Sequence, residues 1–204
     1  ISVLILTLNE ESNLPGCLEA VAWSDDVVVY DSFSTDRTVE LAGQMGARVV
    51  QRAFDTYAAQ RTAALTEVEY KNEWVLMVDA DERWGEELHQ GMKTAIAKHG
   101  TDTAIFHFTR NDYFFGKRLA HSIASKTWAG RLVKLGQVTI TRGINEEYHT
   151  DGGKVFLPLK FDHYPFSNGI AYWFERHNRY STMEASALIA EVAEPFRFRA
   201  LWAG

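Results

Sequence analysis

Residues 74–82 read WVLMVDADE, a short apolar run that ends in a cluster of acidic residues. An apolar run of this length, bounded by polar residues, is typical of a buried β-strand. Similar apolar runs occupy residues 2–8, 27–30 and 48–51. Segments with apolar residues at helical spacing lie between the strands and after the last one, at residues 9–23, 34–45, 56–68 and 86–98.

Strands that alternate with helices in this way predict an α/β fold with a mostly parallel central sheet flanked by helices. In such a sheet, the ligand binds in the crevice beyond the carboxyl ends of the strands. Polar clusters follow the predicted strands at three of these ends: Thr7, Asn9 and Glu10; the segment that begins at Asp31; and the segment that begins at Asp79. We therefore expect one site that collects all three clusters.

Asp79 and Asp81 form an Asp-x-Asp sequence directly after a predicted strand. Carboxylates two residues apart can share a Mg²⁺ or Mn²⁺ ion, because these hard cations prefer oxygen ligands and take few of them from the protein. Such an ion neutralises charge that develops on a departing nucleotide diphosphate. A solvated turn is the alternative for an isolated copy, and its position after the fourth strand favours the cation site.

Each of the other residues at the strand ends has two possible roles: to bind the base or ribose of a nucleotide, or to cap the following helix. Asp31 could accept a hydrogen bond from a base or a ribose hydroxyl, or it could cap the next helix. Thr7, Asn9 and Glu10 could cradle the base and ribose, or cap as well. Arg61, early in a helical stretch, could neutralise phosphate or stack on the base, and a solvated surface arginine is the alternative.

The pattern changes after Gly100, where we place a soft boundary within a single domain of residues 1–204. Residues 1–100 form the expected nucleotide-sugar-binding half. Residues 101–204 form the expected acceptor-binding half, a mixed α/β portion that we expect to be truncated at its C-terminus. Its predicted elements are strands at 103–108, 131–135, 137–141 and 155–159, with the second and third able to pair, a polar loop at 143–153 and a helix over 167–192.

Two acidic residues and one histidine are the candidates for chemistry in the second half. Glu146 and Glu147 lie in the polar loop, where one of them could remove a proton from an attacking hydroxyl group. The alternative is a charged surface loop. His163 could be a third ligand of the cation, although a lone histidine is more often a structural residue.

Composition excludes several classes of protein. The 204 residues carry 21 basic and 27 acidic side chains, a formal charge of −6, which argues against broad nucleic-acid binding. Cys17 is the only cysteine, so neither an internal disulfide nor a Cys-rich zinc site can form. No apolar run approaches the roughly 18 residues of a membrane span. Sequence signatures of dinucleotide-binding, P-loop, serine-hydrolase and zinc-protease sites are also missing.

The final residues, 195–204 (PFRFRALWAG), mix aromatic residues with arginine. Such a segment can lie in a membrane interface. An ordinary tail is the alternative, and we favour it.

Four segments together resemble a family 2 glycosyltransferase with the GT-A fold: ISVLILTLNEESNLPGCLEAV (1–21), VVVYDSFSTDRTVELA (27–42), AAQRTAAL (58–65) and WVLMVDADE (74–82). The second half resembles the branch that includes bacterial lipopolysaccharide-core β-glucosyltransferases, through GRLVKLG (130–136), GINEEYH (143–149), FDHYPF (161–166) and RHNRYSTMEA (176–185).

The resemblance implies a role for each candidate residue. Asp31 corresponds to the acid that contacts the uracil, with Thr7 and Glu10 nearby, and Arg61 to a basic residue beside the base. Asp79 corresponds to the ribose-side acid and Asp81 to the metal ligand. Glu146 stands where this branch usually has a His-Glu pair, and here Asn145 precedes it. Glu147 leaves open which acid is the base, and the role of His163 stays open.

The resemblance also implies a function. We expect a metal-dependent inverting hexosyltransferase that uses a UDP-sugar donor with Mg²⁺ or Mn²⁺ and a glycan or lipid-linked glycan acceptor in cell-envelope or lipopolysaccharide biosynthesis. We expect it in the cytoplasm, with peripheral contact to the inner face of the cytoplasmic membrane as an option. The alternatives are a sugar-phosphate nucleotidyltransferase of related fold and a non-catalytic module that binds nucleotide sugars.

Overall fold

The computed structural model describes residues 1–122, 126–143 and 145–192. The expectation for residues 195–204 lies outside this part of the chain. Within the part described, no helix is long and apolar enough to cross a membrane.

The first half folds as expected, with four parallel strands in the order β3-β2-β1-β4. The strands are β1 (Ser2–Thr7), β2 (Val27–Asp31), β3 (Arg48–Gln51) and β4 (Trp74–Asp79). The helices are α1 (Leu14–Ala20), α2 (Thr38–Gln44), α3 (Tyr57–Glu67) and α4 (Glu86–His99). Thr7 pairs with Asp31, and Leu6 pairs with Asp79. The register therefore brings the polar ends of three strands to the same edge of the sheet.

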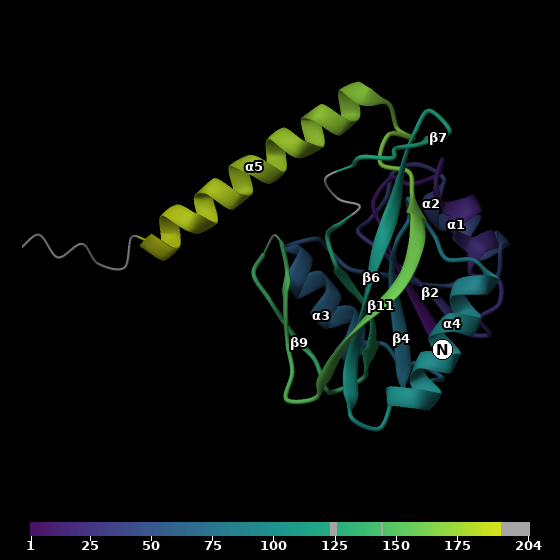
Figure 1. Cartoon of the computed structure of the whole chain (residues 1–204). Helices are drawn as coiled ribbons and strands as arrows, with labels where there is room; N and C mark the ends of the chain where they lie inside the picture. Colours follow the sequence, from purple (N-terminus) through teal and green to yellow (C-terminus); the bar gives the residue numbers. More distant parts are fainter. Residues whose placement is uncertain (123–125, 144, 193–204) are drawn as a thin grey trace, which may run out of the picture.

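The second half extends the same sheet on the far side of β4 (Figure 1). The order continues as β8 (Ala129–Lys134), β6 (Thr103–Phe114), β11 (Gly153–His163) and β5 (Glu82–Arg83). The short β7 (Lys117–Arg118) pairs with β6. A separate two-stranded sheet contains β9 (Thr139–Thr141) and β10 (Glu147–His149). The final helix, α5 (Ile170–Val192), extends away from the body of the molecule.

Apolar side chains cover both faces of the sheet. Along β1, Val3 and Ile5 pack into a cluster with α1, α2 and α4, and Leu4 packs into a second cluster with α3. A strand buried on both faces explains the continuous apolar runs of the sequence. Burial of each such side chain contributes roughly 1.5–3 kcal/mol. The core therefore fixes the strand ends that carry the polar residues.

The expected pairing between residues 131–135 and 137–141 is wrong. β8 lies inside the main sheet, antiparallel to both β4 and β6, so both of its edges are already paired. β9 instead pairs with β10 and directs Ile140 into the cluster that contains α3. Burial of the apolar strand β8 on both faces outweighs the local hairpin.

Two strands are longer than their apolar runs predict. β6 continues from 108 to 114, and β11 continues from 159 to 163. The added residues are mostly polar, and they pair with each other, with His163 opposite Asp112. The helix expected over residues 9–23 is shorter, Leu14–Ala20, and Asn9 lies outside it in a left-handed backbone conformation (φ 56°). These departures all lie at the polar edge of the sheet.

Candidate active site

Arg61 lies at the centre of the polar edge and joins its two halves. From α3, its Nε donates to Glu146 Oε1 at 2.9 Å, and its Nη2 donates to Asp79 Oδ1 at 2.8 Å. The side chain is only 6% exposed. A buried guanidinium needs carboxylate partners to offset the loss of water. Arg61 is therefore a fixed bridge between the end of β4 and the loop before β10, and the predicted solvated alternative does not hold for it.

Arg131 holds the other oxygen of Asp79. From β8, its Nη2 donates to Asp79 Oδ2 at 2.6 Å and to Glu82 Oε1 at 2.5 Å. Burial raises the pKa of the Asp79 carboxyl, but Arg131 and Arg61 outweigh burial and hold the pKa well below its usual range. For Glu82, burial dominates and raises the pKa. Asp79 is thus ionised with both oxygens occupied by arginines.

The carboxylate of Asp81 faces His163, whereas that of Asp79 faces Arg61 and Arg131. His163 Nε2 lies 3.5 Å from Asp81 Oδ2, and the other ring nitrogen, Nδ1, lies 2.7 Å from Asp112 Oδ1. Burial alone would lower the pKa of His163, but Asp81 and Asp112 raise it to about 9. Burial raises the pKa of Asp81, but the opposing effect of His163 is larger, so the pKa lies below its usual value. The pair is charged in this structure.

Asp31 and Thr7 meet at the end of the neighbouring strands. Thr7 Oγ1 donates to Asp31 Oδ1 at 2.9 Å, while Ser34 N and Gln51 Nε2 donate to Asp31 Oδ2 at 2.9 and 3.0 Å. Asn9 Oδ1 accepts from Thr35 N at 2.8 Å. These bonds fix the loop that follows β2 against the loop that follows β1. Asp31 is not the N-cap of α2, because that helix begins later, at Thr38. Its hydrogen bond to Ser34 N belongs to the loop before the helix.

Glu10 lies near enough to Asp81 and Asp79 for their negative charges to act on its carboxyl group. Burial raises its pKa to about 7, although Asn13 Nδ2 donates to it at 2.7 Å. Glu10 is therefore only about half ionised at neutral pH.

Glu147 lies apart from this group. It is exposed on β10, with its carboxylate 3.4 Å from Arg142 Nη1 and 3.7 Å from His149 Nε2. Neighbouring residues in an extended segment point to opposite sides, so Glu146 turns inward to Arg61 while Glu147 faces outward. The structure brings Glu146, and not Glu147, to Asp79.

The residues present fit a divalent cation at Asp81 and His163. Asp112 fixes the ring of His163 through Nδ1 and so directs Nε2 at the Asp81 carboxylate. Once a cation displaces the Nε2 proton, this nitrogen is placed as in histidines that bind metals. Asp79 does not complete this set, because Arg61 and Arg131 already neutralise its carboxylate. Among the described residues, no group of three or more His, Cys, Asp or Glu side chains converges as a metal site. A cation there would need further oxygen ligands from a substrate.

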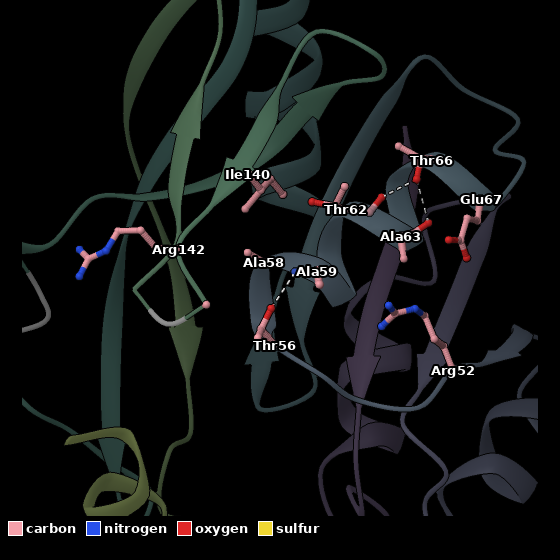
Figure 2. Close-up of a pocket in the computed structure, with 11 residues that line it drawn as sticks. Arg52, Thr56, Ala58, Ala59, Thr62, Ala63, Thr66, Glu67, Ile140 and Arg142 are labelled. Atoms are coloured by element: carbon pink, nitrogen blue, oxygen red, sulfur yellow. Dashed lines mark hydrogen bonds between the residues drawn. The ribbon is translucent and has the colours of Figure 1, made fainter. Parts of the chain in front are cut away.

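The groove drawn in Figure 2 is a different place. It has a volume of about 520 Å³ and lies between α3 and β9, next to Ala59, Thr62 and Ile140. Arg142 points away from α3 in this view. Arg61 is on α3 as well, but its guanidinium reaches Asp79 and Glu146. The lining of the groove therefore does not include Arg61, Asp79 or Glu146.

Sequence reasoning missed Arg131 and Asp112, and it included Glu82 in the polar cluster of residues 79–82 without giving it a role. A signal was present for Arg131, which stands between apolar residues of the segment AGRLVK. A charge in the middle of a buried strand must have a buried partner. For Asp112 no local signal exists, because its contact to His163 depends on the pairing of β6 with β11.

The fold agrees with the comparison to known families. The family model described as Glycosyl transferase family 2 matches residues 2–157, so this chain belongs to that family. The structure of residues 1–349 of TarS from S. aureus aligns with a TM-score of 0.60 at 18% identity, over 80% of this chain and 60% of the TarS chain. The predicted GT-A fold is thereby confirmed.

Two relatives align with nearly the whole chain. An uncharacterized glycosyltransferase of Rickettsia typhi, RT0209, is 27% identical over 98% of this chain and 71% of its own length. The lipopolysaccharide core biosynthesis glycosyltransferase LpsC of Rhizobium meliloti is 24% identical over 96% of this chain and 74% of its own length. The resemblance seen in the sequence, to family 2 and to a lipopolysaccharide-core enzyme, is confirmed.

Proposed function

We propose that the protein is an inverting glycosyltransferase that moves a hexose from a UDP-sugar to a hydroxyl group of a glycan or lipid-linked glycan. The observation that carries the proposal is the bridge at Arg61, which holds Glu146 beside Asp79 at the carboxyl end of β4. A candidate base is thus linked through Arg61 to the first acid of the Asp-x-Asp sequence. Membership of family 2 and the similarity to LpsC support a role in lipopolysaccharide or other cell-envelope polysaccharide synthesis.

In this proposal, Glu146 is the general base. Its carboxylate accepts the proton of the acceptor hydroxyl while that oxygen bonds to the anomeric carbon. The bond from the anomeric carbon to the diphosphate oxygen breaks on the opposite face, so a single displacement inverts the configuration. Arg61 positions Glu146 for this step, because its Nε holds one carboxylate oxygen.

Asp81 and His163 are the proposed ligands of a Mg²⁺ or Mn²⁺ ion, and the ion supplies positive charge that stabilises the leaving UDP. Asp79, ionised between Arg61 and Arg131, is the proposed ribose-side acid. Thr7, Asn9, Glu10 and Asp31 line the proposed site for the base and ribose. We place the protein in the cytoplasm, at the inner face of the cytoplasmic membrane when its acceptor is lipid-linked.

The test is a thermal-shift panel of nucleotide sugars, with and without Mn²⁺. A ligand that binds only the folded state raises the unfolding midpoint in proportion to the logarithm of its concentration over Kd. A shift with UDP-sugars that requires Mn²⁺ is the expected result. A shift with UTP alone would favour a sugar-phosphate nucleotidyltransferase. UDP-sugar binding without turnover of any acceptor would favour a non-catalytic module.

A further inference from the structure

Arg176 brings a second positive charge to Asp81 from a distant part of the chain. It lies on α5, and its Nη1 is 3.6 Å from Asp81 Oδ2. The side chain is only 16% exposed, and its Nε is buried without a hydrogen-bond partner among the described residues. A buried guanidinium donor without a partner costs free energy unless a ligand satisfies it. The free Nε therefore points to a ligand that accepts hydrogen bonds.

The local charges indicate which ligand this is. Asp81 already has His163 as a cationic partner, with 3.5 Å between His163 Nε2 and Asp81 Oδ2. When a divalent cation occupies Asp81 and His163, it takes up the carboxylate that lies 3.6 Å from Arg176 Nη1. A diphosphate would then supply the missing negative charge. The planar guanidinium matches phosphate oxygens with paired donors.

Further side-chain contacts link α5 to the body of the molecule. Tyr57 Oη donates to Tyr180 Oη at 3.2 Å, which fastens the middle of α5 to the start of α3. Glu184 accepts from Arg142 Nη2 at 2.7 Å and from Asn145 Nδ2 at 3.0 Å. Asn145 directly precedes Glu146 in the sequence. In Figure 1, α5 leaves the body near β7 and runs outward. The helix thus connects the end of β4 with the loop that carries the candidate base.

We propose that Arg176 binds the diphosphate of the nucleotide-sugar donor, and that α5 is therefore part of the donor site. The inference rests on the proposed function, because it takes a UDP-sugar as the donor. The competing interpretation is a structural ion pair between Arg176 and Asp81 that no ligand touches.

The experiment compares the binding of UDP, UMP and uridine by calorimetry at saturating Mn²⁺. Arg176→Gln is the test variant. Arg179→Gln is the matched control, because Arg179 is exposed on the same helix and its loss changes the net charge equally. Thermal unfolding of each variant verifies that it is folded. Arg176→Lys keeps the charge but removes the paired donors.

We expect Arg176→Gln to weaken UDP binding about tenfold or more, the cost of a lost hydrogen bond to a charged group. Uridine binding should change less than about twofold, and UMP should fall between the two. Arg179→Gln should match wild type, and Arg176→Lys should be intermediate for UDP. Equal losses for all three ligands, or no loss for UDP, would overturn the inference. Failure of the wild-type protein to bind UDP would instead overturn the proposed function.

Discussion

Arg61 Nε donates to Glu146 Oε1 across 2.9 Å, although the two residues lie 85 positions apart in the sequence. The bond links α3, in the first half of the chain, to the loop before β10, in the second. Tyr57 N, at the start of the same helix, donates to Gly143 O at 3.2 Å and reinforces the link. The position of the candidate base therefore depends on the first half of the chain.

Replacement of Glu146 by Gln tests its role as the base. The amide keeps the size of the side chain but cannot take the proton of the acceptor, so kcat should fall by about 10²–10⁴-fold. The Kd for UDP in the presence of Mn²⁺ should stay within about threefold of wild type, because a base that acts only on the acceptor adds no donor binding energy. Steady-state kinetics and calorimetry measure the two quantities.

Glu147→Gln is the matched control, one residue along on the exposed face of β10. It should leave kcat within about twofold of wild type, since an exposed ion pair such as that with Arg142 contributes little. If Glu147→Gln instead lost most of its kcat while Glu146→Gln kept the wild-type kcat, the base would be Glu147.

Asp81→Asn tests the cation site. The substitution removes the carboxylate that faces His163 and Arg176, and a neutral amide is a poor ligand for a hard cation. The Mn²⁺-dependent part of the thermal shift with UDP should disappear, and transfer should fall by more than about a hundredfold. Asp162→Asn, in the same region but bonded to Asn111, is the control. A Mn²⁺-dependent shift that survives in Asp81→Asn would rule out Asp81 as the ligand.

Arg131→Met tests the stabilising role of the clamp on Asp79. Without Arg131, Asp79 keeps only Arg61 as a positively charged partner, and the buried Glu82 loses its arginine. The free energy of unfolding should therefore fall by about 3–5 kcal/mol. Urea denaturation measures the loss. The exposed Arg118→Met should change the stability by less than about 0.5 kcal/mol. Adding Glu82→Gln to Arg131→Met should recover part of the loss, because it removes the uncompensated acid.

The sequence predicts the first half of the fold because each of its strands is a local apolar run. Val3, Leu4 and Ile5 mark a strand buried on both faces, and the residue after such a run must lie at the sheet edge. The strand-end acids, such as Asp79, were predictable for that reason. The pairing of His163 with Asp112 was not, because it depends on the register of β11 against β6. Likewise, the approach of an arginine from α5 to the acids after β4 depends on the path of that helix, which no local pattern specifies.

The pH dependence of stability in metal-free buffer tests the pair of His163 and Asp81. Asp81 and Asp112 raise the pKa of His163 to about 9 despite its burial, so the folded state favours the protonated ring. A raised pKa stabilises the fold fully below the unfolded value of about 6.5, and the contribution is lost as the pH rises through the folded value. The difference in unfolding free energy between wild type and His163→Gln should therefore shrink by about 3 kcal/mol from about pH 6 to about pH 10. Urea denaturation in EDTA across this range measures it. A difference that stays constant with pH would mean that His163 is neutral in the folded protein and that Asp81 lacks this partner.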